Sequence, residues 1–273
     1  MQNFSASPRE ILASLWKNKG LIRNLVYREV AGRYKGSILG IFWSLANPVF
    51  MLMVYTFVFS VVFKARWGAG GSDSKTEFAL VLFAGLMVFN LFAECISKAP
   101  GLILANANYV KKVVFPLEIL PWVSMGSAIF HFLVSLGVWL VAYLLFFGLP
   151  YWQILLLPIV LLPLVLFVMG LSWALASLGV YLRDIAQVIG VLITTLMFLT
   201  PIFYPASSLP PAYQTLIFLN PLTAPIEMVR DLMYWGKLPN VMLLATSALG
   251  ALACSCLGFA WFQKTRKGFA DVL

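Results

Sequence analysis

Residues 154–182 read ILLLPIVLLPLVLFVMGLSWALASLGVYL and contain no Asp, Glu, Lys or Arg. A helix needs only about 20 apolar residues to cross the roughly 30 Å hydrocarbon core of a bilayer. A water-soluble domain rarely buries so long an uncharged run around its full circumference. This stretch therefore predicts a membrane-spanning helix, and it decides how the rest of the chain is interpreted.

Similar runs lie on both sides of this stretch. Hydrophobic residues make up 62% of the 273 residues and charged residues 11%, which excludes a soluble domain, a disordered tail and a small disulfide scaffold. One run contains a single acid, Glu94, which we expect either to snorkel to the interface or to pair with Lys98 four residues later. We predict an all-α polytopic membrane protein with six transmembrane helices, at about 38–63, 78–96, 119–147, 154–182, 185–202 and 240–263.

The distribution of basic residues predicts the orientation. When the N-terminus is placed in the cytoplasm, most of the 19 Lys and Arg residues fall on the inner segments. Such an excess is typical of the cytoplasmic side of membrane proteins. We therefore expect both termini to be cytoplasmic. The net charge of +9 is explained by this topology and by contact with membrane lipid, without nucleic acid.

The segment before the first span, residues 1–37, mixes apolar and basic side chains. Between Pro8 and Lys35 the apolar residues recur at near-helical spacing. This pattern predicts an amphipathic helix in the cytoplasmic interface. We treat residues 38–273 as one transmembrane domain.

Residues 203–239 differ from the spans because prolines interrupt the apolar sequence. Two short helices are expected, at 213–219 and 225–235, with Asn220-Pro221 between them and Asn220 or Thr223 as a cap. Neither is long enough to cross a membrane. We predict a re-entrant helical hairpin entered from the outer face; the alternative is a solvated outer loop.

The sequence offers little catalytic chemistry. It has no nucleotide-binding P-loop, and its single histidine, His131, lies mid-span with no Cys, Asp or Glu near it in sequence, so we expect a packed hydrogen-bonding residue and no metal site. We expect Asp184 and Asp231 each to neutralise the arginine before it. No catalytic residues are predicted. An integral-membrane enzyme acting on polyprenyl-linked glycans stays an alternative, which would need an acid cluster to hold a metal ion.

Three stretches together resemble the permease subunits of ABC exporters for lipid-linked polysaccharides, the O-antigen and teichoic-acid export family. They are residues 27–48 (YREVAGRYKGSILGIFWSLANP), the loop 108–121 (NYVKKVVFPLEILP) and residues 220–231 (NPLTAPIEMVRD). The loop is the most specific, and the resemblance covers essentially the whole chain. An ABC permease for another lipid or a drug remains an alternative, and the type of polysaccharide (O-antigen, teichoic acid, capsule or another) stays open.

The resemblance implies partners and roles. It implies a homodimer in the bacterial inner membrane with two copies of a cytoplasmic ABC ATPase, which would bind ATP and Mg²⁺, so this chain would need no cofactor. The loop 98–118 would couple to the ATPase through a helix at about 104–115. The coupling residues would be Val110, Lys111, Lys112 and Phe115. A polyprenyl-pyrophosphate head could meet Arg28, Arg33 or Lys35, although attraction to anionic lipid explains these basic residues equally well.

A hydrated, charged polymer needs a protein-lined path, because even one charge at the bilayer centre is costly. We expect the first and fifth spans to line it, since the first follows the amphipathic segment and the fifth leads into the hairpin. The predicted lining residues are Asn47, Met51, Tyr55, Phe59, Thr194, Phe198 and Pro201. The predicted outer gate, formed by the hairpin, comprises Phe203, Tyr204, Pro221 and Arg230.

Overall fold

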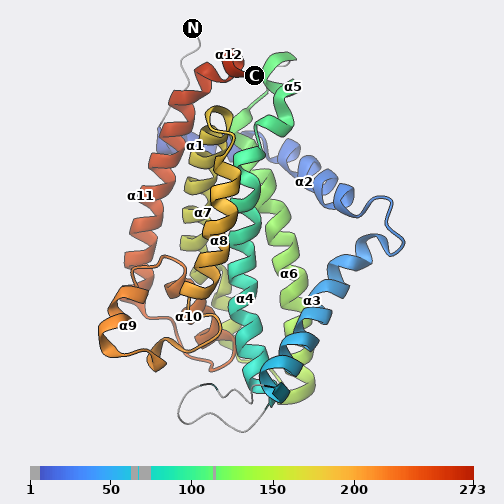
Figure 1. Cartoon of the computed structure of the whole chain (residues 1–273), viewed down its shortest axis with the longest axis vertical. Helices are drawn as coiled ribbons and strands as arrows, with labels where there is room; N and C mark the ends of the chain where they lie inside the picture. Colours follow the sequence, from blue (N-terminus) through green and yellow to red (C-terminus); the bar gives the residue numbers. More distant parts are fainter. Residues whose placement is uncertain (1–6, 63–66, 68–74, 113–114) are drawn as a thin grey trace.

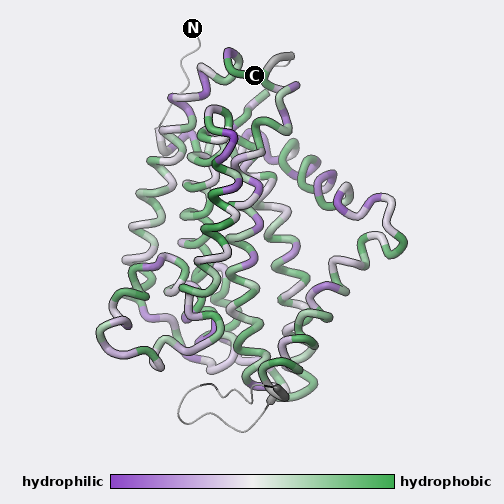
Figure 2. Tube along the Cα trace, in the orientation of Figure 1, coloured by the Kyte–Doolittle hydropathy of each residue, from purple (hydrophilic) through white to green (hydrophobic). Residues whose placement is uncertain are grey.

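The computed structural model describes residues 7–62, 67, 75–112 and 115–273, and every regular element in these ranges is helical. Five helical segments are long and apolar enough to cross a membrane: Gly40–Phe59, Thr76–Gly101, Leu117–Phe147, Trp152–Tyr181 and Val241–Val272. Hydrophobic residues follow the long helices, and hydrophilic residues gather toward the end where the C-terminus lies (Figure 2). The prediction of an all-α membrane protein is confirmed.

The central helix is α4 (Lys75–Lys98), which is buried along most of its length. It packs against α6 (Leu120–Phe147), α7 (Leu157–Tyr181) and α10 (Thr223–Met233). The indole of Trp139 on α6 donates a hydrogen bond of 2.9 Å to the carbonyl of Leu80 on α4. This bond satisfies a buried donor and fixes the two helices in register.

Helices α7 and α11 (Val241–Thr265) cross at two glycines. A Cβ atom on Gly258 would collide with the carbonyl of Gly170, and one on Gly170 would lie 2.5 Å from the carbonyl oxygen of Cys254. Only residues without a side chain allow this approach, as is common between membrane helices.

The N-terminal segment forms two helices rather than the single helix that we predicted. Helix α1 (Pro8–Lys17) ends at Asn18, whose side-chain Nδ2 donates to the carbonyl of Ser14 at 2.8 Å. Helix α2 (Lys19–Tyr34) then begins, and its Val26 side chain fits against Gly126 on α6. An asparagine that bonds to the preceding turn competes with continued helix. Figure 1 shows α2 leaning away from the bundle and α3 (Trp43–Tyr55) returning toward it.

Helix α8 (Ile185–Leu199) is shorter than the span predicted at 185–202. At about 1.5 Å per residue it rises about 22 Å, less than the hydrocarbon core. It ends because Thr200 precedes Pro201 and adopts extended backbone, with φ −85° and ψ 142°. The count of six spans therefore stays a prediction.

The 203–239 segment contains the two short helices expected, α9 (Pro211–Ile217) and α10. Helix α10 is buried, and α9 has no buried residue. The expected cap is wrong, since Leu222 is the N-cap residue of α10 and makes no side-chain cap bond. Asn220 instead stabilises the turn by accepting from the Leu222 backbone N–H at 3.0 Å and donating to Thr200 Oγ1 at 2.9 Å. The depth of this hairpin in a membrane stays a prediction.

The loop after α4 contains the short helix α5 (Ala107–Lys112), shorter than the helix expected at 104–115, and residues 113–114 lie outside the described ranges. Helix α1, α5 and the C-terminus lie toward the same end of the molecule (Figure 1). The remaining elements are the 3-10 turns η1 (Gly40–Phe42), η3 (Ala99–Gly101), η4 (Leu104–Asn106), η5 (Leu117–Ile119), η6 (Trp152–Leu156), η7 (Ala206–Ser208) and η8 (Arg266–Gly268), the π-helical segment η2 (Thr56–Val62), and α12 (Phe269–Val272).

Candidate functional site

A cavity of about 500 Å³ lies between the end of α2, α3, α4 and α6. Three of the predicted channel residues, Asn47, Met51 and Tyr55, line it from one face of α3. Neutral polar groups of Asn90 and Ser135 lie on its other walls. The cavity therefore offers hydroxyl and amide groups together with aromatic and apolar surface, a combination suited to a polar organic ligand.

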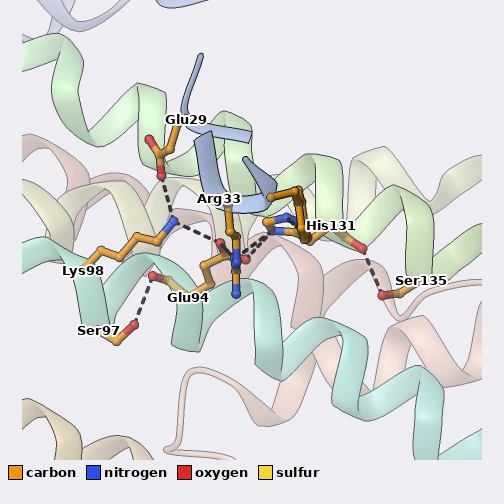
Figure 3. Close-up of polar contacts among 8 residues, drawn as sticks. Glu29, Arg33, Glu94, Ser97, Lys98, His131 and Ser135 are labelled. Atoms are coloured by element: carbon orange, nitrogen blue, oxygen red, sulfur yellow. Dashed lines mark hydrogen bonds and ion pairs between the residues drawn. The ribbon is translucent and has the colours of Figure 1, made fainter. Parts of the chain in front are cut away.

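An ionic network forms part of the cavity wall. The carboxylate of Glu94 on α4 accepts from Arg33 Nη1 at 2.7 Å, from Lys98 Nζ at 3.1 Å and from His131 Nδ1 at 2.8 Å (Figure 3). Of the two alternatives expected for Glu94, pairing with Lys98 is therefore the one observed. One acid joins α2, α4 and α6, and its side chain is 16% exposed.

The neighbouring groups orient this network. Glu29 on α2 accepts from Lys98 Nζ at 2.7 Å, and Tyr34 Oη lies 3.1 Å from His131 Nε2. With the proton on the Nδ1 that faces the Glu94 carboxylate, the ring places Nε2 where it can accept from Tyr34. Burial raises the pKa of the Tyr34 hydroxyl above its ordinary value of 10.0, which keeps it protonated as a donor.

His131 is a packed hydrogen-bonding residue, as expected, but one of its partners is an acid that is distant in sequence. Glu94 lies 37 residues away in sequence but within hydrogen-bond distance of the ring. The sequence did contain a signal, namely one acid and one histidine in two otherwise apolar spans. Such polar groups usually face the bundle interior and find one another there.

The predicted head-group residues do not converge on one point. Arg33 lies at the cavity, whereas Arg28 donates to Tyr109 Oη of α5 at 3.0 Å. Lys35 follows α2 as its C-cap residue and is exposed. Arg33 is therefore the residue of the three that is placed to meet a ligand in the cavity.

The predicted α8 lining lies apart from this cavity. Thr194 and Phe198 are exposed, Pro201 is buried, and Ile193 is the α8 residue at the cavity wall. A second grouping forms at the opposite end of the molecule from the C-terminus, where Phe203 stacks on both Phe59 and Phe198 with ring centroids 5.8 Å apart. This cluster links the end of the first span to the start of the hairpin. In the same region, Tyr204 donates to the Phe198 carbonyl at 3.5 Å, and Pro221 is exposed.

Arg230, which we placed in the outer gate, is fully buried. Its guanidinium donates to the carbonyls of Val81, Pro201 and Ile202 at 3.1, 2.6 and 2.6 Å, and it lies 4.4 Å from the Trp67 ring centroid. These contacts join α10 to α4 and to the end of α8. The side chain is enclosed by protein and does not reach the surface.

The predicted partner of Arg230 is wrong. Its ion pair is with Glu227, at 3.1 Å, because residues three apart lie on the same face of α10. Asp231 faces Lys237 instead, at 3.8 Å. Sequence reasoning also missed Gly85 on α4, where a Cβ atom would lie 2.5 Å from Arg230 Nη2.

The predicted coupling residues are partly packed against the bundle. Val110 and Phe115 are half-buried, and the Phe115 ring stacks on Tyr109 with centroids 4.4 Å apart. Arg266, near the C-terminus, donates to the Phe115 carbonyl at 2.9 Å and pairs with Glu118 at 2.6 Å. Lys111 and Lys112 belong to α5, but their side chains lie outside the described part of the structure.

Among the described residues, no group of three His, Cys, Asp or Glu side chains could hold a metal ion. The chain belongs to the ABC-2 type transporter family, whose model matches residues 20–234, from the start of α2 to just past α10.

The chain is 27% identical over 263 residues to the O-antigen export system permease protein RfbA of Myxococcus xanthus, covering 96% of this chain and 98% of the relative. It is 28% identical to a protein of the same name from Klebsiella pneumoniae, covering 90% and 92%. It is 23% identical to the polysialic acid transport protein KpsM of Escherichia coli, covering 90% and 93%.

Proposed function

We propose that this chain is the membrane-spanning subunit of an ABC exporter that moves a lipid-linked, O-antigen-like polysaccharide across the bacterial inner membrane. It works as a homodimer with two copies of a cytoplasmic ATPase, and both its termini are cytoplasmic. The observation that carries this proposal is the match to O-antigen export permeases along almost the whole length of both chains.

The cavity suits the first step of such transport. A polymer attached to a polyprenyl pyrophosphate has a charged head and many hydroxyl groups, which hydrocarbon excludes. Arg33 at the cavity wall supplies a guanidinium, which binds phosphate oxygens in a fork geometry. Asn47, Asn90 and Ser135 supply hydrogen bonds for sugar hydroxyls, and Tyr55 supplies an aromatic surface. The head and the first sugars would thus enter at the α2 end.

The link from ATP hydrolysis to the cavity runs through α5. ATP and Mg²⁺ bind the partner ATPase, which contacts the molecule at the end that carries α5 and the C-terminus. The bond between Tyr109 and Arg28 connects α5 to α2, and Arg33 connects α2 to Glu94 at the cavity. A displacement of α5 is therefore transmitted to the cavity wall by direct side-chain contacts.

Two other functions fit the sequence less well. An ABC permease for another lipid or a drug would share the fold, but the relatives are named for O-antigen and polysialic acid. An integral-membrane enzyme acting on polyprenyl-linked glycans finds no support in those names. We favour an O-antigen-like cargo because identity is higher to the O-antigen permeases, at 27% and 28%, than to the polysialic acid protein, at 23%.

Deletion of the gene in its own bacterium tests this proposal. We expect the surface polysaccharide to disappear and the lipid-linked polymer to accumulate inside the cell. Wild-type chain should restore the surface polymer, and deletion of the partner ATPase should reproduce the defect. Unchanged surface polysaccharide would contradict the proposal, and so would loss of polymer both inside and outside, which indicates a role in synthesis.

A further inference from the structure

Hydrogen-bond donors from three helices converge on the Glu94 carboxylate. Arg33 comes from α2, Lys98 from α4 and His131 from α6, and each places a nitrogen within 3.1 Å of a Glu94 oxygen (Figure 3). Hydrogen bonds from charged donors to an anion are short and strong, so such a set of donors forms a site for an anion. In this structure that anion is the protein's own side chain.

The same donor set would suit a phosphate group. Arg33 offers a forked guanidinium, Lys98 an ammonium, and His131 a ring N–H, all of which bind phosphate oxygens. The cavity adjoins this point, and Arg33 is half exposed, so a ligand in the cavity can reach the donors. If the Glu94 side chain turned away, the Arg33 guanidinium, a ring N–H of His131 and the Lys98 ammonium, which is still paired with Glu29, would face the cavity.

Two further contacts would hold the donors in place without Glu94. The ion pair of Glu29 with Lys98 and the hydrogen bond between Tyr34 and His131 Nε2 would both remain. The donor geometry therefore does not depend on the acid alone. Glu94 itself is 16% exposed, but its partners Arg33 and Lys98 are 51% and 33% exposed, so a ligand in the cavity can reach the donors that Glu94 occupies.

We propose that Glu94 is a resident counter-ion of a diphosphate-binding site, and that the diphosphate of the substrate displaces it from Arg33, Lys98 and His131. The inference rests on the proposed function and adds to it three residues of the head-group site: Glu94, Lys98 and His131. A diphosphate brings more oxygens and more charge than one carboxylate, so it wins the competition. Its entry breaks the Arg33–Glu94 pair, one of the contacts between α2 and α4.

Movement of α2 would then be possible because of the segment that follows it. Gly36 and Gly40, between α2 and α3, have φ of 86° and 52°, a region that favours glycine. A chain with these residues can change direction between the two helices. Loading of the site would thereby loosen α2 at the cavity mouth.

Ligand binding to the purified full-length chain in detergent tests this inference. The probes are farnesyl diphosphate, inorganic pyrophosphate and farnesol, measured by calorimetry. Glu94→Gln should bind both diphosphate probes about tenfold more tightly than the wild-type chain. A neighbouring charge shifts an ionic equilibrium by about tenfold or more, and we take the lower end because Glu94 is partly exposed. Farnesol binding should not change.

Three variants serve as controls. Glu94→Asp keeps the charge, so its affinity for the diphosphate probes should stay within about threefold of wild type. Glu94→Ala should bind these probes more tightly, as Glu94→Gln does. Asp184→Asn removes an exposed acid that does not line the cavity and should have no effect. Thermal unfolding of each variant shows that it is folded.

The outcomes separate this inference from the proposed function. One outcome is that the wild-type chain binds farnesyl diphosphate but neither Glu94→Gln nor Glu94→Ala binds it more tightly. This result would overturn the counter-ion role of Glu94 and would leave the proposed export function unaffected. Equal tightening of farnesol also overturns that role, because the change would then concern the hydrocarbon tail. Wild-type chain that binds farnesyl diphosphate no better than farnesol contradicts the head-group step of the proposed function itself.

Discussion

The buried arginine of α10 gives the sharpest quantitative prediction. Arg230→Met keeps the apolar stem but removes the charge that bonds to Pro201, Ile202 and Val81, and it leaves those carbonyls without this donor. It also leaves the Glu227 carboxylate without its partner. Removing one partner of a buried ion pair costs about 3–5 kcal/mol. At about 2–4 °C per kcal/mol for a chain of this size, the unfolding temperature in detergent should fall by roughly 10 °C.

Gly85 provides the matched test of this reasoning. Gly85→Ala places a Cβ atom against the guanidinium, so it should destabilise the wild-type chain but have little effect in the Arg230→Met background. Gly137→Ala on α6 is the control, because nothing lies within 4 Å of the added atom. Equal destabilisation by Gly85→Ala in both backgrounds would refute the contact as the cause.

Three further predictions follow from the same structure. Arg33→Glu should reduce export per inserted molecule, measured by surface polymer against membrane abundance, because it reverses the charge at the cavity; a fall in insertion alone would favour a lipid anchor instead. Tyr55→Cys should react with a small aqueous thiol reagent faster than Phe57→Cys, which lies in an apolar groove between α3 and α6, and the opposite order would contradict the cavity. Gly258→Val should abolish a stable fold through collision with α7, whereas Gly250→Val, with open space around it, should be tolerated when yield and unfolding temperature are compared.

The long helices could be predicted from the sequence because the absence of charge over 20 or more residues is a local property. The short helices of the hairpin were also predictable, since prolines mark their starts. The break at Asn18 was missed, because apolar periodicity continues through it while the asparagine bonds back to Ser14. The early end of α8 could have been read from Thr200-Pro201.

The site was only partly predictable, because it depends on contacts between distant residues. The face of Asn47, Met51 and Tyr55 follows from helical spacing and does line the cavity. Helix packing decides which donors converge on Glu94. It also decides that Arg230 bonds to the carbonyl of Val81, which is 149 residues away. Sequence spacing alone contains no information about which helices become neighbours.

ATP-driven export of a lipid-linked polysaccharide by this chain is tested most directly by transport in a reconstituted system. The purified chain and its partner ATPase are placed in sealed vesicles, with lipid-linked polysaccharide on the side that carries the ATPase. The polymer should become accessible to a glycosidase on the opposite side only when ATP, Mg²⁺ and both proteins are present. Transfer or hydrolysis of the polymer by this chain without the ATPase would contradict this function.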